Sequence, residues 1–149
     1  MQESHATSAD EVELKAVVPD LAAARARVEA AGGVLLFEGE LADRRWDTPS
    51  RTLRARDEVI RTRAFLPAPG KPGTPHASLD VKGPTRRVDG YKVREERSTP
   101  VVDVAVVAHA LERAGLVVSR EIDRHVAQYA LHGAVVRFER YPAMDVLVE

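Results

Sequence analysis

The sequence predicts an α+β fold in which an eight-stranded antiparallel sheet closes into a β-barrel, with helices packed on its outside. Three observations favour this fold. Segments in which every second residue is charged recur along the chain, with apolar residues between the charges. In a strand, such residues point to opposite faces of the sheet. Two further segments show apolar residues at helical spacing, and the length suits one domain with a buried core.

The composition excludes several classes of protein. The 149 residues include no cysteine, so neither a disulfide framework nor a zinc site with thiolate ligands is available. The 22 basic residues balance 23 acidic ones, and aromatic residues make up only 5%, which argues against a protein that binds nucleic acid through a basic surface. Because the sequence shows neither a long apolar run nor a signal-peptide pattern, we expect a cytoplasmic protein without a membrane partner.

The strands are expected where the alternation is regular. Residues 1–10 are polar and predicted to form a disordered tail, and residues 11–149 are predicted to form one domain. The first strand contains Glu11, Glu13 and Lys15 on one face, opposite Val12 and Leu14. The predicted strands cover residues 11–17, 34–46, 58–66, 76–82, 91–98, 116–129, 134–140 and 145–149.

Two helices separate these strands. The first is predicted to start after Asp20 as N-cap and to end at Gly32, and the second to start after Asp103 and to end at Gly115. Their apolar stripes are Leu21, Ala24, Val28 and Ala31 in the first helix, and Val104, Val107, Ala108 and Leu111 in the second. Residues 50–56 are predicted as a polar connection, and residues 67–75 and 83–90 as loops.

The charges of the strands indicate a binding site. If the sheet closes, its apolar face must turn outward against the helices and its charged face must line a central tunnel. A barrel of eight strands is just wide enough to hold one small ligand. Burying so many charges is prohibitive unless a ligand of opposite sign and bound cations neutralise them. A triphosphate with Mg²⁺ or Mn²⁺ meets both needs, because Lys and Arg bind phosphate oxygens and carboxylates bind the hard metal ion.

With these residues identified, the sequence resembles the CYTH superfamily of triphosphate tunnel metalloenzymes, in its class IV adenylate cyclase-like branch. The run 11–15 (EVELK) matches the N-terminal ExExK signature of the superfamily. The later matches, in chain order, are residues 46–49, 60–63 and 81–84, then Arg94 with Glu96, and Glu139. The chain departs from the pattern at Asp80, where Thr is more usual, and at Glu149, after which the second acid of a Glu-x-Glu pair is missing.

The resemblance implies an eight-stranded tunnel that binds a triphosphate lengthwise and uses a divalent metal. The implied metal ligands are Glu11, Glu13, Glu96, Glu139 and Glu149. The implied phosphate ligands are Lys15, Arg61, Arg63, Lys82, Arg94 and Arg124, with Arg124 preferred to Arg120 on the same predicted face. Glu11, Glu13 and Lys15 are the implied catalytic residues.

Several functions remain open at this point. The leading one is metal-dependent hydrolysis of inorganic triphosphate, thiamine triphosphate or a nucleoside triphosphate. The alternatives are conversion of ATP to cyclic AMP and pyrophosphate, or a module that binds polyphosphate or nucleotide without catalysis. A nucleic-acid binder would depend on loop arginines such as Arg51, Arg54 and Arg56, which are more often solvated surface. A homodimer also stays open.

Overall fold

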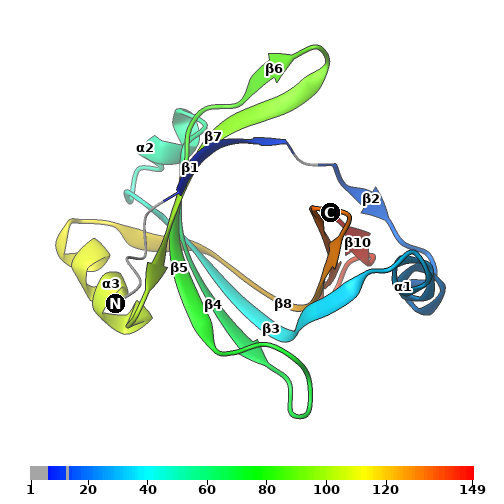
Figure 1. Cartoon of the computed structure of the whole chain (residues 1–149). Helices are drawn as coiled ribbons and strands as arrows, with labels where there is room; N and C mark the ends of the chain where they lie inside the picture. Colours follow the sequence, from blue (N-terminus) through cyan, green and yellow to red (C-terminus); the bar gives the residue numbers. More distant parts are fainter. Residues whose placement is uncertain (1–6, 13) are drawn as a thin grey trace. The chain divides into compact units, whose positions relative to one another are not determined.

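The computed structural model describes residues 7–12 and 14–149, and the side chains of residues 14–149. Its strands are β1 (Thr7–Val12), β2 (Ala16–Val17), β3 (Val34–Asp47), β4 (Val59–Pro67), β5 (His76–Lys82), β6 (Arg86–Val88), β7 (Tyr91–Val101), β8 (Val117–Leu131), β9 (Ala134–Arg140) and β10 (Leu147–Val148). Its helices are α1 (Leu21–Ala30), α2 (Thr52–Ala55) and α3 (Val104–Arg113) (Figure 1).

The strands form one sheet in the order β1-β7-β5-β4-β3-β8-β9-β10-β2, with β6 paired to β7. This path over the described residues starts at β1 and ends at β2, and no strand pair closes it into a ring. The prediction of an antiparallel sheet with helices is therefore confirmed, whereas the closed barrel is not. The count of eight strands is wrong, because the described part of the chain forms ten.

Three differences in the elements account for the wrong count and one missed helix. The first predicted strand is divided, because β1 pairs with β7 whereas β2 pairs with β10. The pairing of β1 starts at Thr7, so residues 7–10 belong to a strand and not to the predicted tail. The short strand β6 lies in the predicted loop 83–90, and α2 lies in the predicted connection 50–56.

The chain divides into two compact units, each built from several segments. Unit 1 comprises the described residues of 1–13, with residues 42–64 and 76–122. Unit 2 comprises residues 14–41, 65–75 and 123–149. Each unit therefore has its own portion of the sheet, and the two are treated one after the other below.

Unit 2 has an apolar core beneath α1. Buried Val18, Ala127, Tyr129 and Phe138 pack together, and the rings of Tyr129 and Phe138 meet edge to face with centroids 6.0 Å apart. Leu21, Ala24 and Val28 of α1 pack against this cluster, as their helical spacing predicts. The predicted N-cap is also confirmed, since the Ala23 N–H donates to the Asp20 carboxylate at 3.0 Å.

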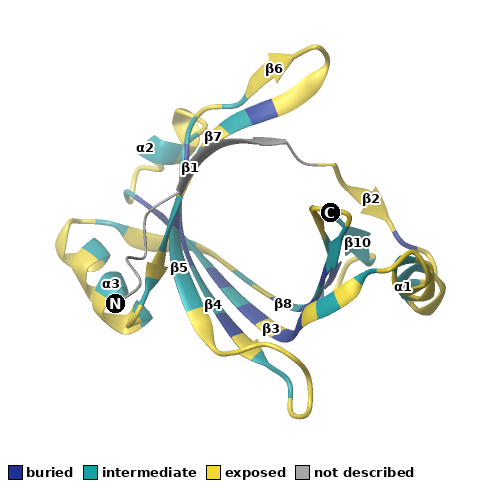
Figure 2. Ribbon diagram, in the orientation of Figure 1, coloured by how far each residue is buried: buried dark blue, intermediate teal, exposed yellow. Residues whose placement is uncertain are grey.

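A second apolar cluster lies elsewhere in unit 2. Phe37, Leu41, Phe65 and Val126 are all buried, and the rings of Phe37 and Phe65 meet edge to face at 5.6 Å. Burial concentrates in the strands, whereas α1 and α3 have no fully buried residue (Figure 2). Both helices are therefore surface layers on their own units.

Unit 1 is organised around β3, β4 and the helix α2. The Trp46 indole N–H donates to the Thr62 hydroxyl at 3.0 Å, and both residues are buried. Asp103 caps α3 as predicted, accepting from the N–H groups of Ala105 and Val106 at 2.9 and 3.2 Å. Among the helices of the described chain, none is long and apolar enough to cross a membrane.

Candidate functional site

The pairing of β5 with β7 places several polar residues on one face of unit 1. Lys82 lies opposite Glu96, and Asp80 lies opposite Ser98. Directly opposite residues of an antiparallel pair share a face, as do residues two apart in one strand. Asp80, Lys82, Arg94, Glu96 and Ser98 therefore occupy the same face of unit 1. We call this surface, with the β4 residues that contact it, the charged face.

Arg61 of β4 contacts two acids of the charged face. Its Nε donates to Asp80 Oδ2 at 3.0 Å, and its Nη2 donates to Glu96 Oε1 at 3.3 Å. The other oxygen of Glu96 lies 3.2 Å from Lys82 Nζ. Arg61, Asp80 and Lys82 are only 5%, 3% and 8% exposed, so their charges lie in a medium where electrostatic interactions are strong.

Arg63 extends this network along β4. Its Nε lies 3.5 Å from Asp43 Oδ2 and 3.8 Å from Asp80 Oδ2. Burial alone would raise the pKa of Asp80. The Ser98 hydroxyl and the two arginines lower it by more than burial raises it, so this pKa lies below its ordinary value. The unusual acid of the sequence is therefore an ionised partner of the predicted phosphate-binding arginines at neutral pH.

Arg94 is held at the edge of the charged face by backbone carbonyls. Its Nε donates to the Gly83 carbonyl and its Nη2 to the Asp57 carbonyl, both at 2.8 Å. Its strand neighbour Arg97 points to the opposite face, where it pairs with Glu95 at 2.7 Å. In the β1–β7 pair the register partner of Arg94 is Glu11, whose side chain is not described.

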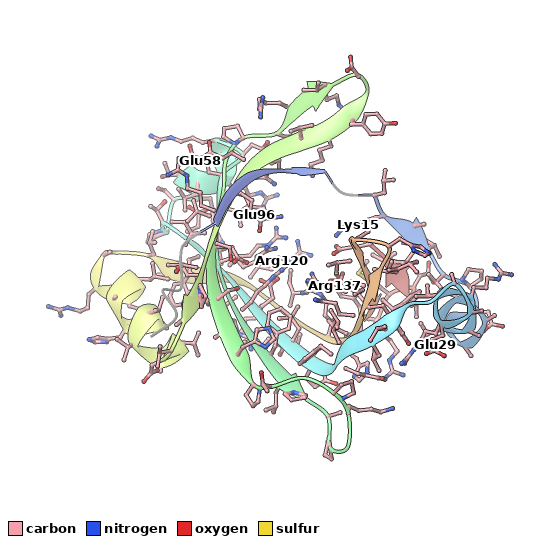
Figure 3. The ribbon with its side chains drawn as sticks, in the orientation of Figure 1. Lys15, Glu29, Glu58, Glu96, Arg120 and Arg137 are labelled. Atoms are coloured by element: carbon pink, nitrogen blue, oxygen red, sulfur yellow. The ribbon has the colours of Figure 1, made fainter. Side chains whose placement is uncertain are left out.

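Unit 2 carries a second group of charged residues, on β9 and the chain segments beside it. The backbones of Arg137 and Glu149 exchange two hydrogen bonds of 2.9 Å. The Glu149 carboxylate contacts Lys15 Nζ through Oε1, and its Oε2 lies 3.6 Å from Arg137 Nη1. Figure 3 labels Lys15 and Arg137, the two cations that bind this carboxylate.

Glu139 is the most enclosed acid of unit 2, with 0% exposure. Its Oε1 accepts from Arg124 Nε at 3.0 Å, and its Oε2 accepts from the Tyr141 hydroxyl at 2.7 Å. Burial and this carboxylate raise the pKa of Tyr141 to about 12, so the phenol stays a donor at neutral pH. The Arg124 guanidinium also lies 5.4 Å from the Tyr141 ring centroid.

The structure thus gathers the predicted site residues into two groups. Unit 1 holds Arg61, Arg63, Lys82, Arg94 and Glu96, and unit 2 holds Lys15, Arg124, Glu139 and Glu149. Glu13 lies outside the described residues, and only the backbone of Glu11 is described. Within the described part of the chain, no group of three or more acidic or histidine side chains forms a set of metal ligands.

Several partners of these residues were missed in the sequence. Ser98 and Tyr141 each lie two residues from a predicted site residue in the same segment, so the period of two would have found them. Asp43 could not be found in this way, because its place beside Arg63 depends on the pairing of distant strands. Arg120 lines a pocket of unit 1 and Arg124 lies in unit 2, so they belong to different surroundings.

Comparison with known proteins identifies the fold. No family model and no curated protein matches the sequence. A candidate adenylate cyclase from Vibrio parahaemolyticus matches with a TM-score of 0.76 at 18% identity, over 95% of this chain and 72% of its own. The protein PH1819 from Pyrococcus horikoshii matches with a TM-score of 0.76 at 19% identity, over 94% of this chain and 75% of its own.

A third structure adds an activity to the comparison. A candidate adenylyl cyclase from Hippeastrum, described as having a dominant triphosphatase activity, matches with a TM-score of 0.66 at 15% identity, over 93% of this chain and 76% of its own. Identities this low show a shared fold. The resemblance inferred from the sequence motifs is confirmed at that level.

Proposed function

We propose that this chain, which has the fold of the CYTH superfamily, is an enzyme that binds a triphosphate compound on its charged face and processes it with a divalent metal ion. The observation that carries the proposal is the common face of Arg61, Arg63, Lys82 and Arg94 in unit 1. Guanidinium groups bind phosphate oxygens in pairs, and burial strengthens each such bond. A row of four cations on neighbouring strands suits a ligand with several adjacent phosphates.

The acids of the charged face hold the cations in place before a ligand arrives. Asp80 and Glu96 fix Arg61 and Lys82 by ion pairs, so little side-chain entropy is lost when phosphate binds. Arg94 is fixed by two carbonyl groups, and its Nη2 also lies 3.8 Å from Asp57 Oδ1. Its guanidinium is therefore oriented before a ligand binds.

The acids of the predicted metal site fit a hard divalent cation by donor type. Mg²⁺ and Mn²⁺ prefer carboxylate oxygens, and Glu139 and Glu149 offer these on adjacent strand segments of unit 2. We also propose Glu11, Glu13 and Glu96 as metal ligands. When bound, such an ion activates a water or hydroxyl group and offsets the charge that builds on phosphoryl oxygens.

The remaining chemistry belongs to the cations of the chain. Arg61, Arg63 and Lys82 align the phosphates for in-line attack. None of these residues needs to act as a covalent nucleophile. Hydrolysis results when water attacks, and cyclic AMP with pyrophosphate results when the ribose hydroxyl of ATP attacks.

We further propose that residues 11–149 act as one domain and that Lys15 of unit 2 is a phosphate ligand. Lys71 of the same unit is a matched control, because the side chains of Lys15 and Lys71 are 47% and 48% exposed. Lys15→Ala is expected to weaken binding of inorganic triphosphate about tenfold, whereas Lys71→Ala leaves it unchanged. Equal affinities in a calorimetric titration would contradict the role of Lys15.

The enzymatic proposal is tested with purified protein and Mg²⁺ or Mn²⁺. The substrates are inorganic triphosphate, ATP and thiamine triphosphate, with phosphate release and cyclic AMP measured separately. We expect turnover of at least one compound, and its loss on adding a chelator. No turnover of any of the three with either metal would refute the activity.

Matched arginines of unit 1 connect the activity to the charged face. Arg63→Ala removes a cation of that face, and Arg97→Ala removes one from the opposite face. We expect Arg63→Ala to lower kcat/KM by about 100-fold or more and Arg97→Ala to leave it within about threefold. Equal losses in both variants would show that the face is not the site.

A module that binds phosphate without catalysis is the second candidate. It is favoured by the ion pairs that Glu96, Glu139 and Glu149 already make with cations of the chain, which leave fewer oxygens for a metal. Triphosphate binding that survives a chelator, together with absent turnover, would support this candidate. Binding that requires the metal would support the enzyme.

A further inference from the structure

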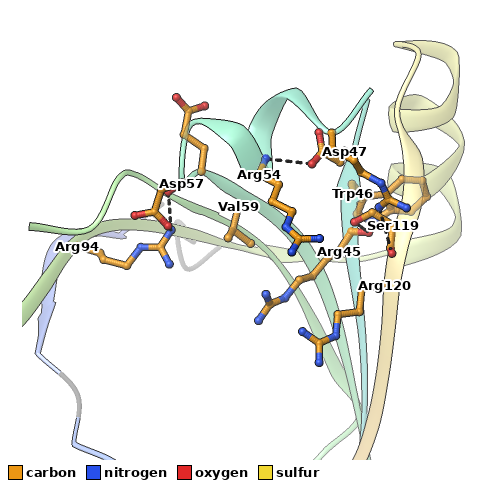
Figure 4. Close-up of a pocket in the computed structure, with 11 residues that line it drawn as sticks. Arg45, Trp46, Asp47, Arg54, Asp57, Val59, Arg94, Ser119 and Arg120 are labelled. Atoms are coloured by element: carbon orange, nitrogen blue, oxygen red, sulfur yellow. Dashed lines mark hydrogen bonds and ion pairs between the residues drawn. The ribbon is translucent and has the colours of Figure 1, made fainter. Parts of the chain in front are cut away.

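Unit 1 contains a pocket beside the charged face (Figure 4). Its volume is about 290 Å³. The lining residues come from β3, α2, β4, β7 and β8 and the turns beside them, and they are Arg45, Trp46, Asp47, Arg51, Arg54, Asp57, Glu58, Val59, Arg94, Ser119 and Arg120. Five of these are arginines and three are acids, so cations predominate.

Two of the three acids are directed to other groups. Asp47 accepts three backbone N–H groups, which belong to Thr48, Leu53 and Arg54, at 2.7, 2.9 and 3.0 Å. Asp57 accepts from the Thr85 N–H at 2.7 Å, its carbonyl accepts from Arg94, and its Oδ1 lies 3.8 Å from Arg94 Nη2. These two acids therefore hold the walls of the pocket, and the other four arginines determine what it can bind.

A hydrogen bond joins two of the elements that line the pocket. Arg51 adopts a left-handed backbone conformation at φ 61°, and its Nη1 donates to the Ser119 carbonyl at 3.2 Å, which joins the start of α2 to β8. Arg54 and Arg120 are both exposed. Figure 4 shows Arg45, Arg54 and Arg120 extending from β3, α2 and β8 toward the same space.

Arg94 belongs to both the charged face and the pocket, so the two surfaces adjoin. A phosphate chain bound at Arg94 would therefore lie next to four further arginines. An anionic group there would be stabilised by bidentate guanidinium contacts. A neutral nucleoside would gain little, because Trp46 is 4% exposed and donates to Thr62, and a thiamine group would be repelled by its positive charge.

We infer that this pocket binds a phosphate group at the far end of the substrate, and that Arg54 and Arg120 determine this specificity. The inference rests on the proposed function and names its substrate class: compounds with a fourth phosphate next to the three on the charged face. Inorganic tetraphosphate is preferred over ATP, which has the same three phosphates followed by a neutral nucleoside.

Two measurements test the inference on the full chain. The first is calorimetric binding of inorganic tetraphosphate and inorganic triphosphate without metal. The second is kcat/KM for tetraphosphate and ATP with Mn²⁺. The test variant is Arg54→Ala combined with Arg120→Ala, and the control combines Arg97→Ala with Arg113→Ala, which removes two exposed arginines of unit 1 outside the pocket.

We expect the natural chain to bind tetraphosphate about tenfold or more tightly than triphosphate. The test variant should lose most of this difference and keep its kcat/KM for ATP within about threefold, and the control variant should keep both. Equal binding of the two phosphates by the natural chain would overturn the inference even if ATP is hydrolysed. Retained binding preference without any turnover would instead overturn the enzymatic proposal and leave the inference standing.

Discussion

At the scale of single residues, the acids of this chain are held by specific cations. Glu38 of unit 2 is the clearest case, since it is 6% exposed and receives two bonds from Arg25 at 2.9 and 2.8 Å. Arg25 Nε also donates to the Tyr129 hydroxyl at 2.8 Å. The Arg25 guanidinium lowers the pKa of Glu38 to about 2, although burial alone would raise it.

This pKa predicts how stability depends on pH. Because the folded pKa is below the unfolded value, Glu38 stabilises the fold above about pH 4.5, and this stabilisation is lost as pH falls toward 2. At about 1.4 kcal/mol per pKa unit, the loss is about 3 kcal/mol. Denaturant unfolding from pH 6 to pH 2 should show a smaller acid-induced loss in Glu38→Gln. A curve for Glu38→Gln parallel to that of Glu40→Gln, whose carboxylate is 66% exposed, would contradict this.

The sequence predicted the face of a strand on which a residue lies, whereas the site roles came from the resemblance. The period of two places Arg61, Lys82 and Glu96 on the charged sides of their own strands, and it requires no knowledge of neighbours. The contact of Asp43 with Arg63 depends on which strands pair and in which register. A single sequence does not determine that register, so the partners appeared only in the structure.

At the scale of elements, α2 is a helix that depends on one side chain. Four residues are too few for a helical period to be visible in the sequence. Asp47 stabilises it by accepting three backbone N–H groups, and although burial raises the pKa of this acid, these donors lower it below its ordinary value. α2 is therefore maintained by a buried acceptor and not by helix propensity.

Replacement of Asp47 should therefore affect both the helix and the pocket beside it. We expect Asp47→Ala to lower the free energy of unfolding by about 2 kcal/mol, because three N–H groups lose their acceptor. Chemical denaturation measures the loss, with Asp145→Ala at an exposed position as control. If both variants lose the same stability, α2 does not depend on Asp47.

A glycine of β3 permits a close backbone approach within unit 2. A Cβ atom at Gly39 would overlap the Leu66 carbonyl oxygen and lie 2.7 Å from Pro67 Cα, so the backbone would have to move. We expect Gly39→Ala to cost about 2–3 kcal/mol in thermal or denaturant unfolding. Gly83→Ala is the control, because its Cβ would meet only ordinary contacts from 3.7 Å outward. Equal stability of the two variants would contradict the close approach.

The elements that could be predicted from the sequence are those with long, regular alternation. β5 and β9 have the predicted bounds, and both long helices start at the predicted caps. The division between β1 and β2 was missed, because the alternation 11–17 is continuous while the two strands pair with different partners. Strand pairing thus overrides a regular local pattern.

At the scale of the whole molecule, positive and negative side chains are nearly equal in number but unevenly distributed. The net charge is only -1, yet cations concentrate on the charged face and the pocket of unit 1. Composition argues against a generally basic surface, but it does not show these local concentrations. The proposed function therefore rests on position and not on total charge.

The central claim is that the charged face of unit 1 binds triphosphate, and calorimetric titration with inorganic triphosphate in the presence of Mn²⁺ tests it most directly. Lys82→Met removes a cation of the face that is 8% exposed, and Arg97→Met removes an exposed cation from the opposite face of the same unit. We predict that Lys82→Met weakens binding by about 10- to 100-fold and that Arg97→Met binds as the natural chain does. Unchanged affinity in Lys82→Met, with the variant still folded, would contradict the account.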